Sequence, residues 1–248
     1  MKGLWAIYKR ELFALFVTPM AWVLIVVFLV IQGWHFYLLV DYFARNVELS
    51  VDQGPVQAFF GESIIFYFPL VLLCPGMTMR LFAEERRSGT IETLLTAPVT
   101  TTGIVLGKFA GALTAYAAMW LPTLLYIVVL RRAGEIDWHV VATSYAGVLL
   151  IGAGYLAIGT LMSSMTKSQL TAVVLSSLVI LGLFVLGIGE FILDSGVARD
   201  FCAYVSVYSQ MGELSKGIVD LRRLVLDATI IALPLFVTVR AVDAWRWG

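Results

Sequence analysis

The stretch that decides the fold is Met20–Val40, which reads MAWVLIVVFLVIQGWHFYLLV. Its length matches the ~20 residues that an α-helix needs to cross a ~30 Å hydrocarbon layer at ~1.5 Å per residue. Gln32 and His35 are its only strongly polar side chains. The stretch is too long for the apolar region of a secretory signal, and no small-residue cleavage site follows it. We therefore predict an uncleaved first transmembrane helix.

The composition of the whole chain extends this interpretation. Hydrophobic residues make up 60% of the 248 residues, charged residues only 14%, and the mean hydropathy is +0.90. Soluble domains are about half apolar and a quarter charged, so much of this apolar surface must face membrane lipid. The formal net charge is zero, which offers no basic surplus for nucleic acid. Cys74 and Cys202 are the only cysteines, and they predict no disulfide framework.

Five further apolar stretches are long enough to cross a bilayer. They lie at about Glu62–Leu81, Ile104–Leu130, Val140–Met162, Leu170–Ile188 and Leu224–Val239. The predicted fold class is an all-α integral membrane protein with six transmembrane helices in one domain, residues 1–248. Six crossings put both termini on one side, and that side carries the majority of the Lys and Arg residues. The positive-inside rule therefore favours cytoplasmic termini. We expect a location in the cell (inner) membrane.

Residues 1–18 predict an amphipathic helix that lies in the membrane interface. Its apolar residues recur at helical spacing: Leu4, Tyr8, Leu12 and Leu15. Its charged residues form a separate group: Lys9, Arg10 and Glu11. The segment is too charged to cross a bilayer, and Pro19 is expected to break the helix before the first span. This geometry is that of an elbow.

Residues 83–102 form the densest polar stretch, between the second and third predicted spans. We expect a short helix from Thr90 to Leu95 that ends before Pro98. Its apolar face is formed by Ile91, Leu94 and Leu95, and such a face could dock in a groove on another protein. The alternative is a solvated turn that serves only the positive-inside rule, and the residues alone leave both open.

Gly103, Gly107 and Gly111 recur every fourth residue at the start of the third span. Small residues at this spacing let helices approach closely. The spacing predicts packing within the chain, with a contact that moves during transport as the alternative.

Motifs for chemistry are missing or incomplete. Residues 103–109, GIVLGKF, have the wrong spacing for a P-loop, so we expect no nucleotide site and no catalytic residue in this chain. His35 and His139 are the only histidines and are expected to pack rather than bind metal. Ser163 and Ser164 lie near Lys167, but at a span end, where polar residues are expected.

The acids in and near the spans argue against coupling to an ion gradient. Glu62, Glu190, Asp194 and Asp227 all fall near span ends, whereas gradient-driven transporters place ionisable groups near the bilayer midplane.

Three parts of the sequence resemble ABC-2 type transporter permeases. The resemblance in the central loop rests on Phe82, Ala83, Glu84, Glu85, Arg86, Gly89, Thr90, Glu92, Leu94, Leu95 and Pro98. Residues 8–12 with Pro19 resemble the elbow helix of this family. Ser206–Ser209 and Gly217–Arg222 resemble the branch related to gliding-motility permeases. Together these resemblances cover essentially the whole chain.

The resemblance implies a function. Two six-span permeases, identical or different, would pair as a dimer with two cytoplasmic ATPase subunits, which bind ATP and Mg. Residues 83–102 would contain the coupling helix that touches the ATPase, through Glu84, Glu85, Arg86, Gly89, Thr90, Glu92, Leu94 and Leu95. Residues 190–223 would form outer re-entrant helices that gate the exit.

The sequence leaves the substrate open. A lipid, glycan, peptide or drug fits an apolar export route, and so does force transmission to an envelope or motility machine. The alternative functions are a secondary transporter or channel that acts without an ATPase, and a membrane enzyme or structural anchor.

Overall fold

The computed structural model describes residues 2–45, 54–61, 63–96, 98–133 and 136–247. These residues form helices joined by short connections, with no strand among them. Six helical stretches are long and apolar enough to span a membrane: Pro19–Arg45, Ile65–Ser88, Thr101–Arg132, Trp138–Met165, Gln169–Ile192 and Leu221–Trp245. The predicted all-α fold with six spans is therefore confirmed.

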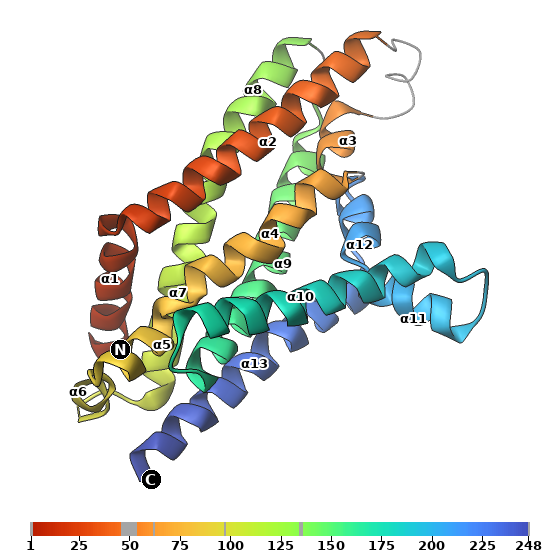
Figure 1. Cartoon of the computed structure of the whole chain (residues 1–248). Coiled ribbons are helices and arrows are strands. Elements are labelled where there is room, and N and C mark those ends of the chain that lie inside the picture. The colour runs from red at the N-terminus through yellow and green to blue at the C-terminus, as the bar shows by residue number, and fades with distance from the viewer. Residues whose placement is uncertain (1, 46–53, 62, 97, 134–135, 248) are drawn as a thin grey trace.

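The N-terminal helix α1 (Lys2–Val17) stops one residue before α2 (Pro19–Arg45), as the proline predicts. The two helices meet at an angle (Figure 1). Helix α2 continues past the predicted end at Val40. Glu48, Asp52 and Gln53 of the following loop lie outside the described residues, as does Glu62.

The second span is longer than predicted. It consists of α4 (Ile64–Thr78) and α5 (Arg80–Ser88), which follow each other with a helical backbone at Met79. We expected the helix to end at Leu81, where the charged residues begin. It continues because neighbouring helices supply partners for those charges.

The third span is interrupted. It comprises α7 (Thr101–Trp120), a tighter turn η2 (Leu121–Thr123) and α8 (Leu124–Ala133). Pro122 lacks the N–H that an α-helix needs at this point, which accounts for the change in winding.

Helix α9 (Trp138–Met165) lies at the centre of the bundle and packs against α4, α7, α10 (Gln169–Ile192) and α13 (Leu221–Trp247). Its glycines make this packing possible. A Cβ atom on Gly152 would lie 2.2 Å from the ring of Tyr116, and one on Gly159 would lie 2.0 Å from Thr78 Oγ1. Larger residues at either position would push these helices apart.

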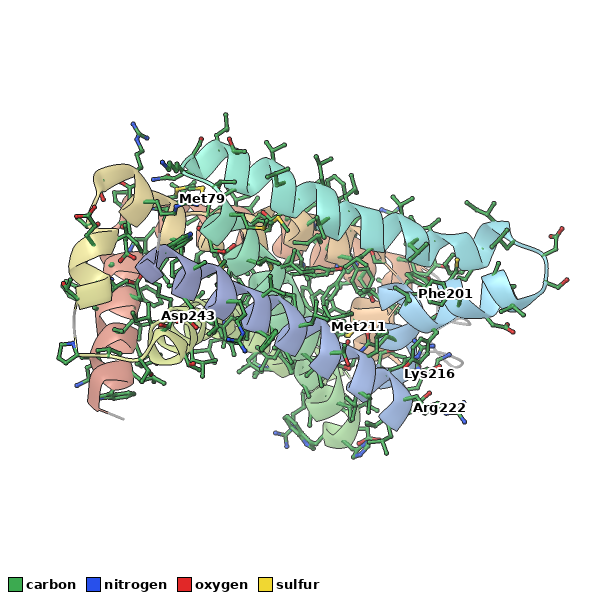
Figure 2. The ribbon with its side chains drawn as sticks, turned by 90° about the horizontal axis from the view of Figure 1, so that it is seen from below. Met79, Phe201, Met211, Lys216, Arg222 and Asp243 are labelled. Carbon is green, nitrogen blue, oxygen red and sulfur yellow. The ribbon has the colours of Figure 1, made fainter. Side chains whose placement is uncertain are left out.

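Both termini and α6 (Ile91–Thr96) lie at one end of the bundle, which we call the terminal end (Figure 1). Helix α13 runs from the opposite end to this one. Figure 2 shows Asp243 at the end of α13 nearest α1, and Arg222 with Lys216 at the other.

At the opposite end, α3 (Pro55–Gly61) was not predicted, because its residues fall between the first and second predicted spans. Val56, Phe59 and Phe60 are buried and anchor it in the core. Polar neighbours in the sequence concealed this short apolar segment.

Residues 190–223 contain two short helices, α11 (Val197–Val205) and α12 (Val207–Leu214), where re-entrant helices were expected. Gly196, with φ of 111°, precedes α11, which packs back against α10. The Ser206 side chain caps α12 by accepting a hydrogen bond from Ser209 N–H.

Candidate functional site

Helix α5 has one face in the core and one at the surface of the terminal end. Leu81, Phe82 and Ala83 are buried, whereas Arg87 and Ser88 are exposed. The helix ends at Gly89, whose φ of 75° is strained for residues with a side chain. This left-handed residue turns the chain into α6.

Ser163 of α9 fastens the start of α5. Its hydroxyl oxygen accepts hydrogen bonds from the N–H groups of Phe82 and Ala83, at 3.1 and 3.2 Å. The same hydroxyl donates to the carbonyl oxygen of Met79 at 2.9 Å. Ser163 is fully buried, so these bonds are shielded from water.

Two charged side chains of α5 extend this attachment to other helices. Arg86 donates from Nη1 to the carbonyl oxygen of Ser164 at 2.8 Å, and its guanidinium group lies 4.7 Å from the ring centre of Trp245 on α13. Glu84 accepts a hydrogen bond from Gln169 at the start of α10. The predicted site residues Glu84 and Arg86 are therefore engaged with the chain's own spans.

The third charged residue, Glu85, belongs to a group with Arg10, Glu11 and Lys108, here called the four-charge cluster. Lys108 Nζ lies 2.8 Å from Glu11 Oε1 and 3.0 Å from Glu85 Oε1. Arg10 Nη2 lies 2.8 and 2.5 Å from the same two atoms. The cluster joins α1, α5 and α7, and its formal charges cancel.

Three side chains of the four-charge cluster are largely shielded from water. The side chain of Lys108 is 1% exposed, and those of Glu11 and Glu85 are 12% and 14% exposed. Burial alone would raise the pKa of Glu11, but Lys108 and Arg10 outweigh it and hold that pKa below its ordinary value of 4.5. A charge this far from water requires its partners.

Lys108 was not predicted to be a site residue. In the sequence it was considered only as part of residues 103–109, whose spacing does not fit a P-loop. The available signal was a lysine within the apolar start of a span, beside Gly103, Gly107 and Gly111, here called the glycine stripe. Its long aliphatic stem lets it reach the two glutamates from within the helix bundle.

The glycine stripe packs α7 against α1. A Cβ atom on Gly107 would lie 3.0 Å from Ile7 Cγ2, and one on Gly111 would lie 3.1 Å from Glu11 Cβ. Gly103 faces Thr100 and Val99. At these glycines α7 therefore packs within the chain, and the helix it packs against is α1. Lys9 stays exposed, 5.3 Å from the ring centre of Trp5.

The short predicted helix exists as α6, but Ile91 and Leu94 face inward. Leu94 is 7% exposed and belongs to the hydrophobic core, and Ile91 packs against that core. The side chain of Leu95 lies outside the described residues. An exposed apolar docking face is therefore wrong for Leu94, because the turn at Gly89 brings α6 back against α5.

Five exposed residues around the turn between α5 and α6 are here called the exposed tip: Arg87, Ser88, Gly89, Thr90 and Glu92. The Ser88 and Thr90 hydroxyls are 2.9 Å apart. The tip carries one positive and one negative side chain.

Within the described part of the chain, no group of three or more His, Cys, Asp or Glu residues could hold a metal ion. His35 is buried and stacks on Phe59 with ring centres 5.1 Å apart, as its predicted packing role requires.

Comparison with known proteins adds one finding. A family model described as ABC-2 family transporter protein matches residues 5–236, which is most of the 248-residue chain. No curated protein matches the chain significantly.

Proposed function

We propose that the chain, which belongs to the ABC-2 family of transporter proteins, is the permease subunit of an ATP-driven exporter. A separate cytoplasmic subunit would hydrolyse ATP with Mg, and a second permease, identical or related, would complete the membrane part. In this proposal both termini face the cytoplasm across the cell membrane. The motifs at Ser206–Ser209 and Gly217–Arg222 favour the gliding-motility-like branch, and with it force transmission as well as solute export.

One observation carries the coupling part of the proposal. The charged side chains of α5 connect it to α1 and α7 through Glu85, to α9 and α13 through Arg86, and to α10 through Glu84. Helix α5 is therefore attached to five other helices. A push on it would be passed to several spans at once, which is what a coupling element must do.

The proposal divides the signature residues into two groups. Glu84, Glu85 and Arg86 have partners within the chain, so we assign them to transmission. The exposed tip is free to meet the ATPase, and its Arg87 and Glu92 offer one charge of each sign. Leu94 and the turn at Gly89 hold the tip in place.

A charge reversal tests the contact. The full chain is co-expressed with its ATPase, and the R87E/E92K variant is compared with R132E, which reverses an exposed arginine at the opposite end of the bundle. Exposed ion pairs contribute ~0.2–1 kcal/mol each, so the loss of two should weaken ATPase binding and stimulation about 2- to 30-fold. R132E should leave both unchanged.

Two measurements separate the alternatives. Equal ATPase stimulation by both variants would refute the tip as the contact. Gradient-driven transport by the purified chain alone, without any ATPase, would instead select the secondary transporter or channel.

A further inference from the structure

An apolar groove lies at the surface of the bundle between α2 and α4, which belong to two of the six spans. Its volume is about 370 Å³. The groove is open to the outside, because Phe68 and Leu72 on its wall are each 54% exposed. Its described walls consist of apolar side chains, among them Val27 and Ile31 of α2 and Ile65, Phe68, Pro69 and Leu72 of α4.

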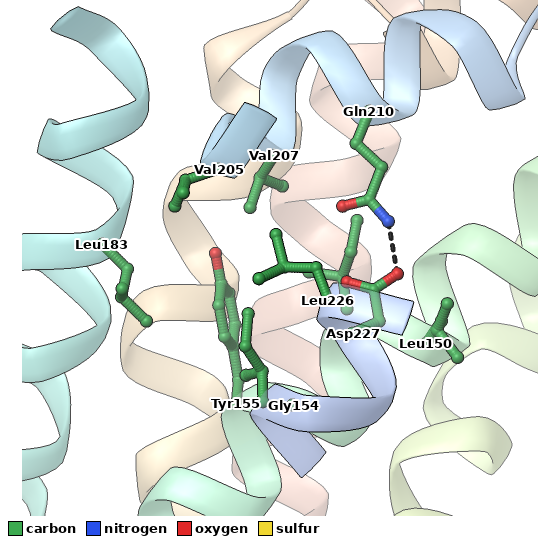
Figure 3. A pocket seen from close by; sticks show the side chains of 11 residues that line it. Leu150, Gly154, Tyr155, Leu183, Val205, Val207, Gln210, Leu226 and Asp227 are labelled. Atoms are coloured by element: carbon green, nitrogen blue, oxygen red, sulfur yellow. Dashed lines mark hydrogen bonds between the residues drawn. The ribbon is translucent and has the colours of Figure 1, made fainter. Parts of the chain in front are cut away.

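A smaller cavity elsewhere in the bundle provides a contrast. It lies between α9, α10, α13 and the junction of α11 with α12, and its volume is about 30 Å³ (Figure 3). At its wall Gln210 Nε2 donates a hydrogen bond to Asp227 Oδ2 at 2.5 Å. One water molecule requires ~10–15 Å³, so this cavity has room for water and little else. The groove has more than ten times this volume and no polar side chain among its described lining residues, so it suits a large apolar occupant.

The groove lies at the depth of the hydrocarbon layer. Exposed aromatic residues of α2 stand on both sides of Val27 and Ile31 along the helix. Trp22, 54% exposed, lies towards the terminal end, and Trp34 and Tyr37, each 61% exposed, lie towards the other. Exposed Trp and Tyr residues collect at the two edges of the hydrocarbon layer, so the groove between them faces lipid tails.

The side chains on the walls favour a flexible chain over a further helix as the occupant. The closest helix contacts of this protein are made by glycine, as between Gly107 and Ile7 and between Gly152 and Tyr116. Small residues of this kind let helices approach closely within a membrane. None of the described residues that line the groove is Gly, Ala, Ser or Thr. A hydrocarbon chain is much narrower than a helix of ~10 Å diameter and can follow such an uneven surface.

Helix α2 also has few protein contacts of its own. In its most apolar part 17% of the residues are buried, against 78% in the span Ile65–Ser88, which forms the other wall of the groove. An empty groove would leave its lining atoms without van der Waals partners on one side. A chain that lies in the groove contacts both walls at once, and it supplies α2 with contacts that the protein does not provide.

We propose that the groove binds an acyl chain of a membrane phospholipid and that this chain joins α2 to α4. The occupant is then a bound part of the structure, held longer than the lipid that covers the rest of the surface. This inference does not depend on an ATPase, so it can fail without affecting the proposed function.

The test is photolabelling of the purified full chain in phosphatidylcholine nanodiscs, where a fraction of the lipid carries a diazirine on one acyl chain. Leu178 of α10 is the matched reference for Leu72, because the two are 59% and 54% exposed. Ser177 Oγ lies 3.2 Å from the carbonyl oxygen of Val71, which places both leucines at a similar depth. A retained chain makes more lasting contacts, so Leu72 should be labelled at least ~3-fold more than Leu178.

Two valines of α2 provide a matched pair of variants. Val27 lines the groove and is 43% exposed, whereas Val30 is 65% exposed and does not line it. Val27→Trp fills part of the groove, so it should lower the labelling of Leu72 about 3-fold. Val30→Trp adds the same bulk outside the groove and should leave that labelling unchanged.

Three results would overturn the proposal. Equal labelling of Leu72 and Leu178 in the unaltered chain would show that the groove does not retain lipid, and this comparison requires no variant to fold. Weaker labelling of Leu72 than of Leu178 would show that a second copy of the chain, and not lipid, covers the groove. Equal effects of V27W and V30W in folded protein would separate the labelling from the groove.

Discussion

The four-charge cluster makes a quantitative prediction through Lys108→Met, which keeps the aliphatic stem and removes the charge. The Lys108 side chain is 1% exposed and lies within 3.0 Å of carboxylate oxygens on two helices. Its loss leaves two glutamates with Arg10 alone, which is 53% exposed. Among the described residues, Glu85 Oε2 already has no hydrogen-bond partner.

The size of the effect follows from burial. Removing one partner of a buried ion pair costs ~3–5 kcal/mol, and Arg10 remains, so we expect about 3 kcal/mol for K108M. The matched control is Arg45→Met, because Arg45 pairs with Asp41 at the surface, with side chains 76% and 39% exposed. An exposed pair contributes ~0.2–1 kcal/mol, so R45M should stay below about 1 kcal/mol.

The assay is reversible unfolding of the purified chain in mixed micelles by urea, followed by tryptophan fluorescence. Adding Glu85→Gln to K108M restores neutrality, so the double variant should be more stable than the sum of the two single effects by at least ~1 kcal/mol. Two results would refute the view that burial makes this cluster strongly stabilising. One is strict additivity of the K108M and E85Q effects on the free energy of unfolding, and the other is a K108M effect no larger than that of R45M.

Two further predictions concern helix α1 and its contact with α7. Gly107→Ala should destabilise the chain by about 1–2 kcal/mol, because the new Cβ would lie 3.0 Å from Ile7 and 3.1 Å from the carbonyl oxygen of Leu4. The control is Gly182→Ala, because a Cβ atom at Gly182 would have no atom within 4 Å. This variant should be neutral or stabilising in the same assay. The pKa of Glu11 is lower in the folded chain than its ordinary value of 4.5. The stabilisation that the ionised Glu11 contributes is therefore fully present above pH 4.5, and it is lost as the pH falls through the pKa of the folded chain. Wild-type stability should therefore fall more steeply below about pH 4.5 than that of Glu11→Gln, and parallel curves would contradict this.

Most of the fold could be predicted from the sequence, because spans are set by long apolar stretches and the bilayer leaves few alternatives. Helix α3 was not predicted, because its buried residues Val56, Phe59 and Phe60 occupy less than two helical turns between polar neighbours. The break at Pro122 escaped for a different reason, since hydropathy is continuous across it.

The candidate site was only partly predictable. The density of charge in residues 83–102 indicated an important loop, but helical spacing cannot say which partner covers an apolar face. Leu94 was expected to face another protein and instead faces the core. Lys108 was hidden because its partners, Glu11 and Glu85, lie far away in the sequence and meet it only through packing.

The division between buried and exposed charges limits how coupling can work. A coupling element must offer a surface to its partner and must also be attached firmly to the parts it moves. Glu84, Glu85 and Arg86 attach α5 to other helices through their partners. An ATPase that bound these three side chains directly would have to break those contacts. The exposed tip, which follows the buried part of α5, offers a surface to the partner. We therefore expect the ATPase to displace the tip and α5 as one body, with the four-charge cluster intact throughout the cycle.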